Sequence, residues 1–171
     1  MDAIYKQVLE ISMDVHTLSH ELHSSKLEYL GLVLAMQGFC KEFGDRHKLE
    51  VDFENEGIPP TLPNEISLCL FRVMQEGLHN ALKHSGVTFY EVKLHGSPTE
   101  VHLTVRESGV GFDPESARKT AGLGLISMQE RVKLVKGTIS ITSTPQSGTA
   151  IYVRVPLSAR AQTEQAKLAG A

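Results

Sequence analysis

The strongest pattern in the chain is a helical one near its middle. Between Pro63 and the Ser85-Gly86 pair, apolar residues recur every three or four positions, which predicts an amphipathic helix with one buried stripe. That stripe consists of Ile66, Cys69, Leu70, Val73, Gly77, Leu78 and Ala81. Beside it runs a polar line made of Arg72, Glu76, Asn80, Lys83 and His84. Solubility alone does not require a carboxylate, a carboxamide and cations next to a buried face. We therefore take this polar line as the first candidate for a functional site.

A period of two, typical of strands with one buried face, appears on both sides of this helix. It covers the ranges 49–54, 89–94, 101–107, 138–142 and 149–155. Further helical patterns cover 26–43, which Gly44-Asp45 is expected to end, and 125–135, which stops at Gly137. Helices interspersed with pairs of neighbouring strands predict an α/β two-layer sandwich. Its sheet should be mixed, mostly antiparallel and covered on one face by helices.

The first 25 residues carry a narrower apolar pattern. Intervals of four and three separate Ile4, Val8, Ile11, Val15, Leu18 and Leu22, a heptad seam that predicts one helix of a coiled coil or bundle. We expect it to form a homodimer; the alternative is an amphipathic helix that folds back on its own domain. No cysteine or acidic cluster accompanies the histidines on one side of this helix, so we expect surface residues rather than metal ligands at His16, His20 and His23.

Length and composition set the outer limits. The 171 residues suffice for one domain with a real core and appended elements: a bundle helix (1–25), the main domain (26–157) and a polar, flexible tail (158–171). A net charge of −3 does not favour nucleic acid as a partner. No apolar run is long enough for a membrane span, so we expect no membrane contact by this segment. Cys40 and Cys69 fall on apolar helix faces, as expected of buried free thiols in a cytoplasmic protein.

Two glycine boxes flank a long loop. Glu107-Ser-Gly-Val-Gly-Phe112 ends a predicted strand, and Gly122-Leu-Gly-Leu125 opens a predicted helix. Glycines let a backbone approach a ligand closely, and a helix N-terminus offers free N–H groups to phosphates. Neither box is a P-loop or a dinucleotide fingerprint. The amide oxygen of Asn80 can hold a hydrated Mg²⁺ that bridges phosphates, and the Glu76 carboxylate can polarise a nucleophile. An acid such as Glu107 can accept a hydrogen bond from an exocyclic amine, which would select adenine.

The order of these motifs resembles the ATP-binding catalytic domain of sensor histidine kinases. The matching boxes are Glu76-x-x-x-Asn80 with Lys83-His84, Glu107-x-Gly109-x-Gly111-Phe112, Gly122-x-Gly124-Leu125 and Gly148-Thr149. The resemblance extends from about Leu49 to Leu157 and implies the Bergerat-type fold shared with gyrase, Hsp90 and MutL. The phrase from Gly122 to Arg131 is similar to the subfamily of the nitrate sensor and the DesK thermosensor.

The resemblance implies a role for each matched residue. Glu76 would be the catalytic acid/base helper and Asn80 the Mg²⁺ ligand, with Lys83 and His84 near the phosphates of ATP. At the adenine, the first glycine box would supply Glu107, Gly109 and Gly111, with Phe112 next to them. At the phosphates, the second box would supply Gly122, Gly124 and Leu125, with Leu123 between them. Thr149 would complete the floor of the nucleotide site. Residues 113–121 would form a mobile lid. One position departs from the pattern, because the family usually has aspartate where this chain has Glu107. We expect the longer side chain either to hold adenine less well or to shift the helix and loop.

The resemblance also bears on the phosphorylated histidine. In the family it lies on the first of two bundle helices, and a whole second helix precedes the ATP domain. Between His23 and Asn80 the chain already holds a helix, a strand, a loop and half of another helix, so neither His20 nor His23 fits. The stretch from Leu22 to Leu32 instead resembles the end of the second bundle helix. We therefore expect the phosphoacceptor histidine to lie outside this chain.

The leading hypothesis is a catalytic domain that uses ATP and Mg²⁺ to phosphorylate a histidine, from which a response-regulator receiver domain takes the phosphate. A cytoplasmic location is expected, with or without a membrane anchor elsewhere in the parent protein. One alternative is a nucleotide-binding or dimerisation module without transfer activity, favoured by Glu107 and opposed by Glu76 and Asn80. Another is an anti-sigma-type serine kinase on the same fold, opposed by the heptad seam.

Overall fold

A computed structural model describes residues 27–112 and 123–157. It begins with a helix over residues 27–47. In chain order there follow β1 (Glu50–Glu56), α2 (Asn64–His84), β2 (Phe89–Gly96), β3 (Glu100–Glu107), α4 (Leu123–Leu134), β4 (Thr138–Thr144) and β5 (Gly148–Pro156). Every strand predicted from the period of two is present. The expected bundle helix, its histidines, the lid and the tail lie outside the described residues.

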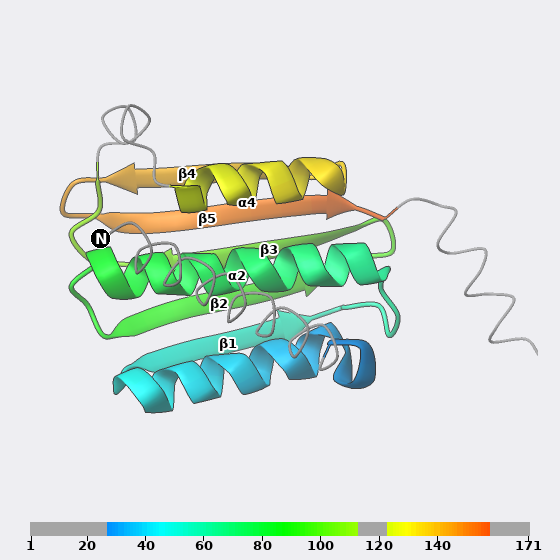
Figure 1. The fold of residues 1–171 in the computed structure, drawn as a ribbon, viewed down its shortest axis with the longest axis horizontal. Helices are drawn as coiled ribbons and strands as arrows, with labels where there is room; N and C mark the ends of the chain where they lie inside the picture. The colour runs from blue at the N-terminus through cyan, green and yellow to red at the C-terminus, as the bar shows by residue number, and fades with distance from the viewer. Residues whose placement is uncertain (1–26, 113–122, 158–171) are drawn as a thin grey trace, which may run out of the picture.

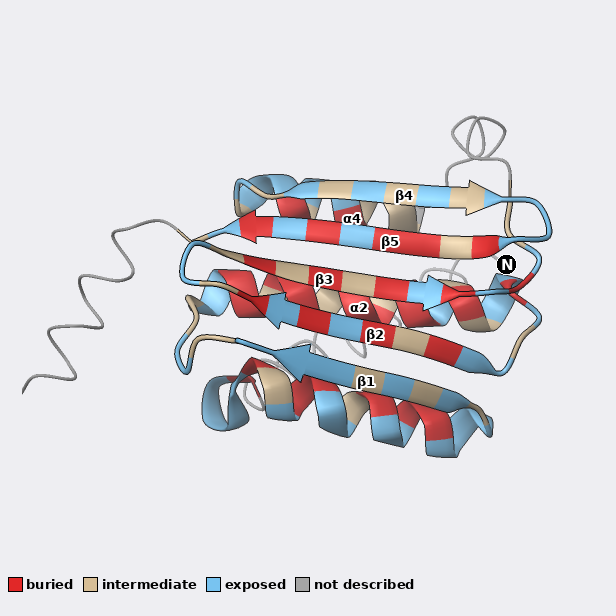
Figure 2. Ribbon diagram, turned by 180° about the vertical axis from the view of Figure 1, so that it is seen from behind, coloured by how far each residue is buried: buried red, intermediate tan, exposed pale blue. Residues whose placement is uncertain are grey.

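The strands form one five-stranded sheet in the order β1-β2-β3-β5-β4. Strands β1 and β2 are parallel, and the other neighbours are antiparallel. In Figure 1 the helix of residues 27–47, α2 and α4 all lie on the near face of the sheet. Figure 2 views the other face, which no helix of the described ranges covers. The prediction of a two-layer α/β sandwich with a mixed, mostly antiparallel sheet is confirmed.

The core lies between the helices and the sheet. Every member of the apolar stripe predicted for α2 is buried. The strands alternate as their sequences indicate, with Val101, Leu103 and Val105 of β3 at 0–4% exposure and their neighbours facing away from the core. None of the helices in the described ranges combines the length and the hydropathy that a membrane crossing requires.

The end of the first described helix differs from its prediction. Gly44-Asp45 was expected to stop it, but the helix continues to residue 47. The stop is Lys48, with φ at +56°, and the Leu49 N–H donates to the Gly44 carbonyl at 3.1 Å. This is the Schellman arrangement, in which the residue of positive φ follows the last helical turn. Gly44 belongs to that turn, so the expected boundary was about one turn early.

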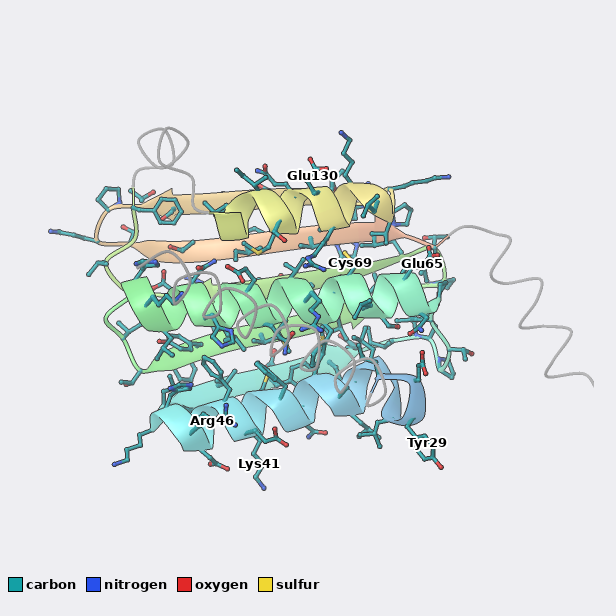
Figure 3. The ribbon with its side chains drawn as sticks, in the orientation of Figure 1. Tyr29, Lys41, Arg46, Glu65, Cys69 and Glu130 are labelled. Carbon is teal, nitrogen blue, oxygen red and sulfur yellow. The ribbon has the colours of Figure 1, made fainter. Side chains whose placement is uncertain are left out.

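Both cysteines are buried and free, as predicted. Figure 3 shows Cys69 on the side of α2 that faces α4. Burial raises the pKa of Cys40 to about 12 and that of Cys69 to about 11, so both remain protonated thiols at neutral pH. Protonated, buried thiols are poor nucleophiles and poor metal ligands.

Ion pairs cover the face of the sheet that the helices leave open. Lys93 lies 2.8 Å from Glu54 on the neighbouring strand, and Arg154 of β5 pairs with Glu100 of β3 at 2.5 Å. Hydrogen bonds from His102 and Arg154 lower the pKa of Glu100. Oppositely charged cross-strand pairs of this kind contribute modestly to strand pairing.

A pair of leucine substitutions tests where the core lies. Leu103 is 1% exposed at the centre of the sheet, whereas Leu134 at the end of α4 is 82% exposed. We expect Leu103→Ala to lower the free energy of unfolding by about 2–5 kcal/mol because it opens a cavity. Leu134→Ala should change it by no more than about 0.5 kcal/mol. Urea unfolding followed by circular dichroism measures both, and equal losses would contradict this placement of the core.

Candidate functional site

A cavity of about 400 Å³ lies between α2, the ends of β3 and β5, and the start of α4. Its lining includes many residues of the predicted nucleotide site: Asn80, His84, Glu107, Gly111, Phe112, Gly124, Leu125 and Thr149. These come from segments that are far apart in the sequence. The close contacts of α2 with the sheet and with α4 bring them together.

Helix α2 contributes a carboxylate and a carboxamide four residues apart. The Asn80 side-chain N–H donates to Glu76 Oε1 at 3.3 Å, which turns the amide oxygen of Asn80 away from Glu76. Both side chains are half-buried. The spacing of four places them on one face of the helix, and their hydrogen bond holds them as a unit.

The Glu76 carboxylate also contacts the first turn of α4. A Cβ atom at Gly124 would lie 2.0 Å from Glu76 Oε1, so only glycine leaves room for the carboxylate there. The first turn of α4 contains no acidic residue of its own. A negative group from α2 therefore lies at the positive end of the α4 dipole, where carboxylates and phosphates are both stabilised.

The first glycine box packs against the end of α2. The Val110 N–H donates to the Ser85 carbonyl at 2.9 Å, and Ser85 is the C-cap of α2. A Cβ atom at Gly109 would lie 2.0 Å from that same carbonyl oxygen. Glu107 is 7% exposed, and its Oε2 accepts the Gly109 N–H at 2.5 Å. The extra methylene of glutamate thus lets the carboxylate turn back onto its own loop.

Thr149 lies opposite Glu107 in the sheet. The two residues form a cross-strand pair between β3 and β5, and both line the cavity. The pair shares the cavity with apolar lining residues, which include Val105, Leu125, Ile141 and Ile151. The site therefore combines an apolar slot with a few fixed polar groups, the usual composition of a small-molecule site.

Some predicted site residues lie elsewhere. Glu76 and Gly109 support the lining residues without being part of the lining, and Lys83 is exposed outside it. Arg72 donates to Gln75 of its own helix at 2.9 Å and is also absent from the lining. Gly122 lies outside the described residues, as does the expected lid; for Leu123 the backbone alone is described.

The sequence interpretation missed several lining residues. They are Gly77, Ala81 and Ser85 of α2 and its cap, Val105 and Arg106 of β3, and Ile141 and Ile151 of the last two strands. The apolar ones were assigned to the core, because the period of an element shows which face is buried but not whether a cavity interrupts that face. The signal available was position along the chain, since all of them except Ile141 lie within five residues of Asn80, Glu107 or Thr149. Ile141 lies seven positions before Gly148, and its sequence carried no such signal.

Comparisons with known proteins identify the family of the chain. Residues 65–159, more than half of the chain, match the family described as histidine kinase-, DNA gyrase B- and HSP90-like ATPase. The chain belongs to this family. It is 38% identical to the oxygen sensor histidine kinase NreB of Staphylococcus carnosus over 84% of the chain and 42% of the relative. It is 30% identical to the histidine-protein kinase/phosphatase DegS of Brevibacillus brevis over 89% of the chain and 39% of the relative.

Solved structures show the same fold. The Erythrobacter litoralis EL346 blue-light activated histidine kinase aligns over 92% of this chain and 51% of its own, with a TM-score of 0.68 and 18% identity. The Acinetobacter baumannii histidine kinase AdeS aligns over 91% of this chain and 85% of its own, with a TM-score of 0.61 and 16% identity. The chain spans less than half of the length of each curated relative. It is an ATPase catalytic domain of the sensor histidine kinase type.

The tight packing at Gly109 leads to a prediction. We expect Gly109→Ala to lower the free energy of unfolding by about 1–3 kcal/mol, because the added methyl group would overlap the Ser85 carbonyl. Gly38→Ala is the matched control, since a Cβ atom there would have no neighbour within 4 Å. Because Gly38 lies within a helix, that change should stabilise the domain by about 0.5–1 kcal/mol. Denaturant unfolding of both variants measures the difference, and a neutral Gly109→Ala would contradict the described contact.

Proposed function

We propose that the cavity binds ATP as its Mg²⁺ complex and that the domain transfers the γ-phosphate to a histidine. The observation that carries the proposal is the grouping of Asn80, Glu107 and Thr149 around one slot with apolar walls. A purine ring fits apolar walls, and its exocyclic amine matches acceptors such as the Glu107 and Thr149 side chains. The resemblance to histidine kinase motifs assigns the same residues to nucleotide binding.

The residues of the cavity suit a magnesium–phosphate group as well as a base. The Asn80 amide oxygen, turned away from Glu76, is a hard ligand of the type that Mg²⁺ prefers. When bound, Mg²⁺ would neutralise phosphate charge. Gly124 and Leu125 at the first turn of α4 would offer backbone N–H groups to phosphate oxygens. Lys83 would add positive charge at the end of α2 and His84 would offer a ring nitrogen there, while Gly122 and Leu123 would complete the phosphate segment.

Glu76 would act on the acceptor rather than on the nucleotide. Its carboxylate is held by Asn80 and lies beside Gly124, close to where the phosphates would be. From there it can accept the proton of an incoming imidazole N–H or orient that ring for attack on the γ-phosphorus. The domain would otherwise work by positioning and by stabilising charge.

The wider role extends the same proposal to the parent protein. The acceptor histidine would lie outside this chain, because the stretch between His23 and Asn80 leaves no room for a second bundle helix. The phosphate would then pass to an aspartate of a response-regulator receiver domain. The heptad seam of residues 1–25 would hold two copies together as a homodimer. The curated relatives, of which this chain spans less than half, are named as sensor or signal-transduction histidine kinases.

Titration with Mg-ADP tests the nucleotide site. Isothermal calorimetry should show micromolar-range binding by the wild type and near-complete loss in Asn80→Ala, because the metal ligand is removed. Asn55→Ala, which changes an exposed asparagine on β1, should bind as the wild type does. Absence of binding heat in the wild type would refute the ATP proposal.

The same titration tests the departure at Glu107. We expect Glu107→Asp to bind Mg-ADP as tightly as the wild type or more tightly. The shorter side chain retains the carboxylate, matches the residue that the family usually has, and reaches less far toward the Gly109 N–H. Weaker binding by Glu107→Asp would indicate that this site is adapted to glutamate.

Transfer is tested by supplying the acceptor separately. Incubated with Mg-ATP, the domain should phosphorylate a helical bundle of the parent protein that carries the acceptor histidine. Glu76→Gln should reduce the rate by about 10²–10⁴-fold with little change in ADP affinity. Glu65→Gln, an exposed change on the same helix, should have no effect. Binding without any transfer would favour the alternative of a module that binds nucleotide only.

A further inference from the structure

Ser143 contacts three residues, two of which, Phe112 and Thr149, line the cavity. This half-buried residue of β4 is not part of the lining. Its Oγ accepts the Phe112 N–H at 2.8 Å and donates to the Gly148 carbonyl at 3.0 Å. The same oxygen lies 3.1 Å from Thr149 Oγ1. One hydroxyl thus connects the end of the first glycine box with the Gly148-Thr149 pair.

The direction of these hydrogen bonds follows from counting protons. A serine hydroxyl has one proton to donate and two lone pairs to accept with. The Gly148 carbonyl can only accept and the Phe112 N–H can only donate, so the proton of Ser143 goes to Gly148. The contact with Thr149 is then satisfied only if Thr149 donates. In this arrangement, which satisfies all three contacts of Ser143, the single proton of the Thr149 hydroxyl points at Ser143, and only its lone pairs remain for the cavity.

This orientation matters because of what lies opposite. Glu107, the cross-strand partner of Thr149, offers carboxylate oxygens, which are acceptors, and it lines the same cavity. With the Thr149 proton directed at Ser143, both side chains of this pair present acceptors. A ligand whose edge carries an amine can donate hydrogen bonds to these two acceptors. A ligand whose edge carries a carbonyl oxygen there would face two acceptors, and its oxygen would receive no hydrogen bond from this pair.

We propose that Ser143 is a positioning residue that fixes the Thr149 hydroxyl as an acceptor and thereby favours a 6-amino purine over a 6-oxo purine. The inference rests on the proposed nucleotide site and adds a specificity-determining residue to it. Ser143 acts through Thr149 and through the Phe112 backbone, not by touching the nucleotide. If Ser143 is removed, the Thr149 hydroxyl can rotate and donate to a carbonyl oxygen.

Calorimetric titration with Mg-ADP and Mg-IDP tests this proposal, because the two nucleotides share sugar and phosphates but differ at position 6. The wild type should prefer ADP. In Ser143→Ala the ratio of the two affinities should fall by about fivefold, the value of roughly one hydrogen bond. Ser140→Ala, the same change at an exposed position of the same strand, should keep the wild-type ratio.

A second variant guards against a folding defect in Ser143→Ala. Thr149→Val removes the oriented hydroxyl itself, so it should lower the ADP preference by a similar factor. The double variant should lose little more than either single one, because both act through the same hydrogen bond.

The outcomes separate this inference from the proposed function. If Ser143→Ala lowers the affinity for Mg-ADP and Mg-IDP by the same factor, so that their ratio is unchanged, the role of Ser143 is purely structural and the inference is overturned. An unchanged ratio in Thr149→Val, or no ADP preference in the wild type, would also overturn it while leaving the nucleotide site intact. No ADP binding by the wild type would overturn the site and this inference together.

Discussion

Helix α2 packs closely on β3 and β5 at Gly77, where a methyl group would lie only 3.1 Å from Ile151 and 3.2 Å from Val105. This close approach sets the height of the helix above the sheet. It buries the apolar stripe and places the next residues of the helix at the edge of the sheet rather than in solvent. Glu76 and Asn80 are therefore half-buried beside the cavity. A longer distance between helix and sheet would separate them from the glycine boxes.

The second constraint is the end of α2. Ser85 caps the helix and its carbonyl accepts the Val110 N–H, so the helix and the first glycine box meet through backbone atoms. Gly109 is required at this junction because any side chain would overlap that carbonyl. The Glu107 carboxylate is fixed by the same loop. A site built on backbone contacts of this kind has little freedom to rearrange, which suits a binding site whose polar groups are few.

Periodicity predicted most of the architecture. The period of two located each strand of the sheet, and the three-and-four spacing located α2 and its buried face. These patterns succeed because each element has one face against a single core, so local sequence and tertiary burial agree. The predicted end of the first described helix at Gly44 was wrong, because a glycine within the last turn looks in the sequence like the glycine that follows a helix. Only the positive φ of Lys48 shows where that helix ends.

The sequence by itself determined the order of the elements, the buried stripe of α2 and the motifs that place the chain among histidine kinase-like ATPases. It could do so because periodicity and short motifs are local properties. The tertiary structure decided the rest. The cross-strand pairing of Glu107 with Thr149, the contact of Glu76 with Gly124 and the hydrogen bond from Phe112 to Ser143 join residues that are distant in the chain. Their partners depend on strand register and helix packing, which no spacing along the sequence specifies.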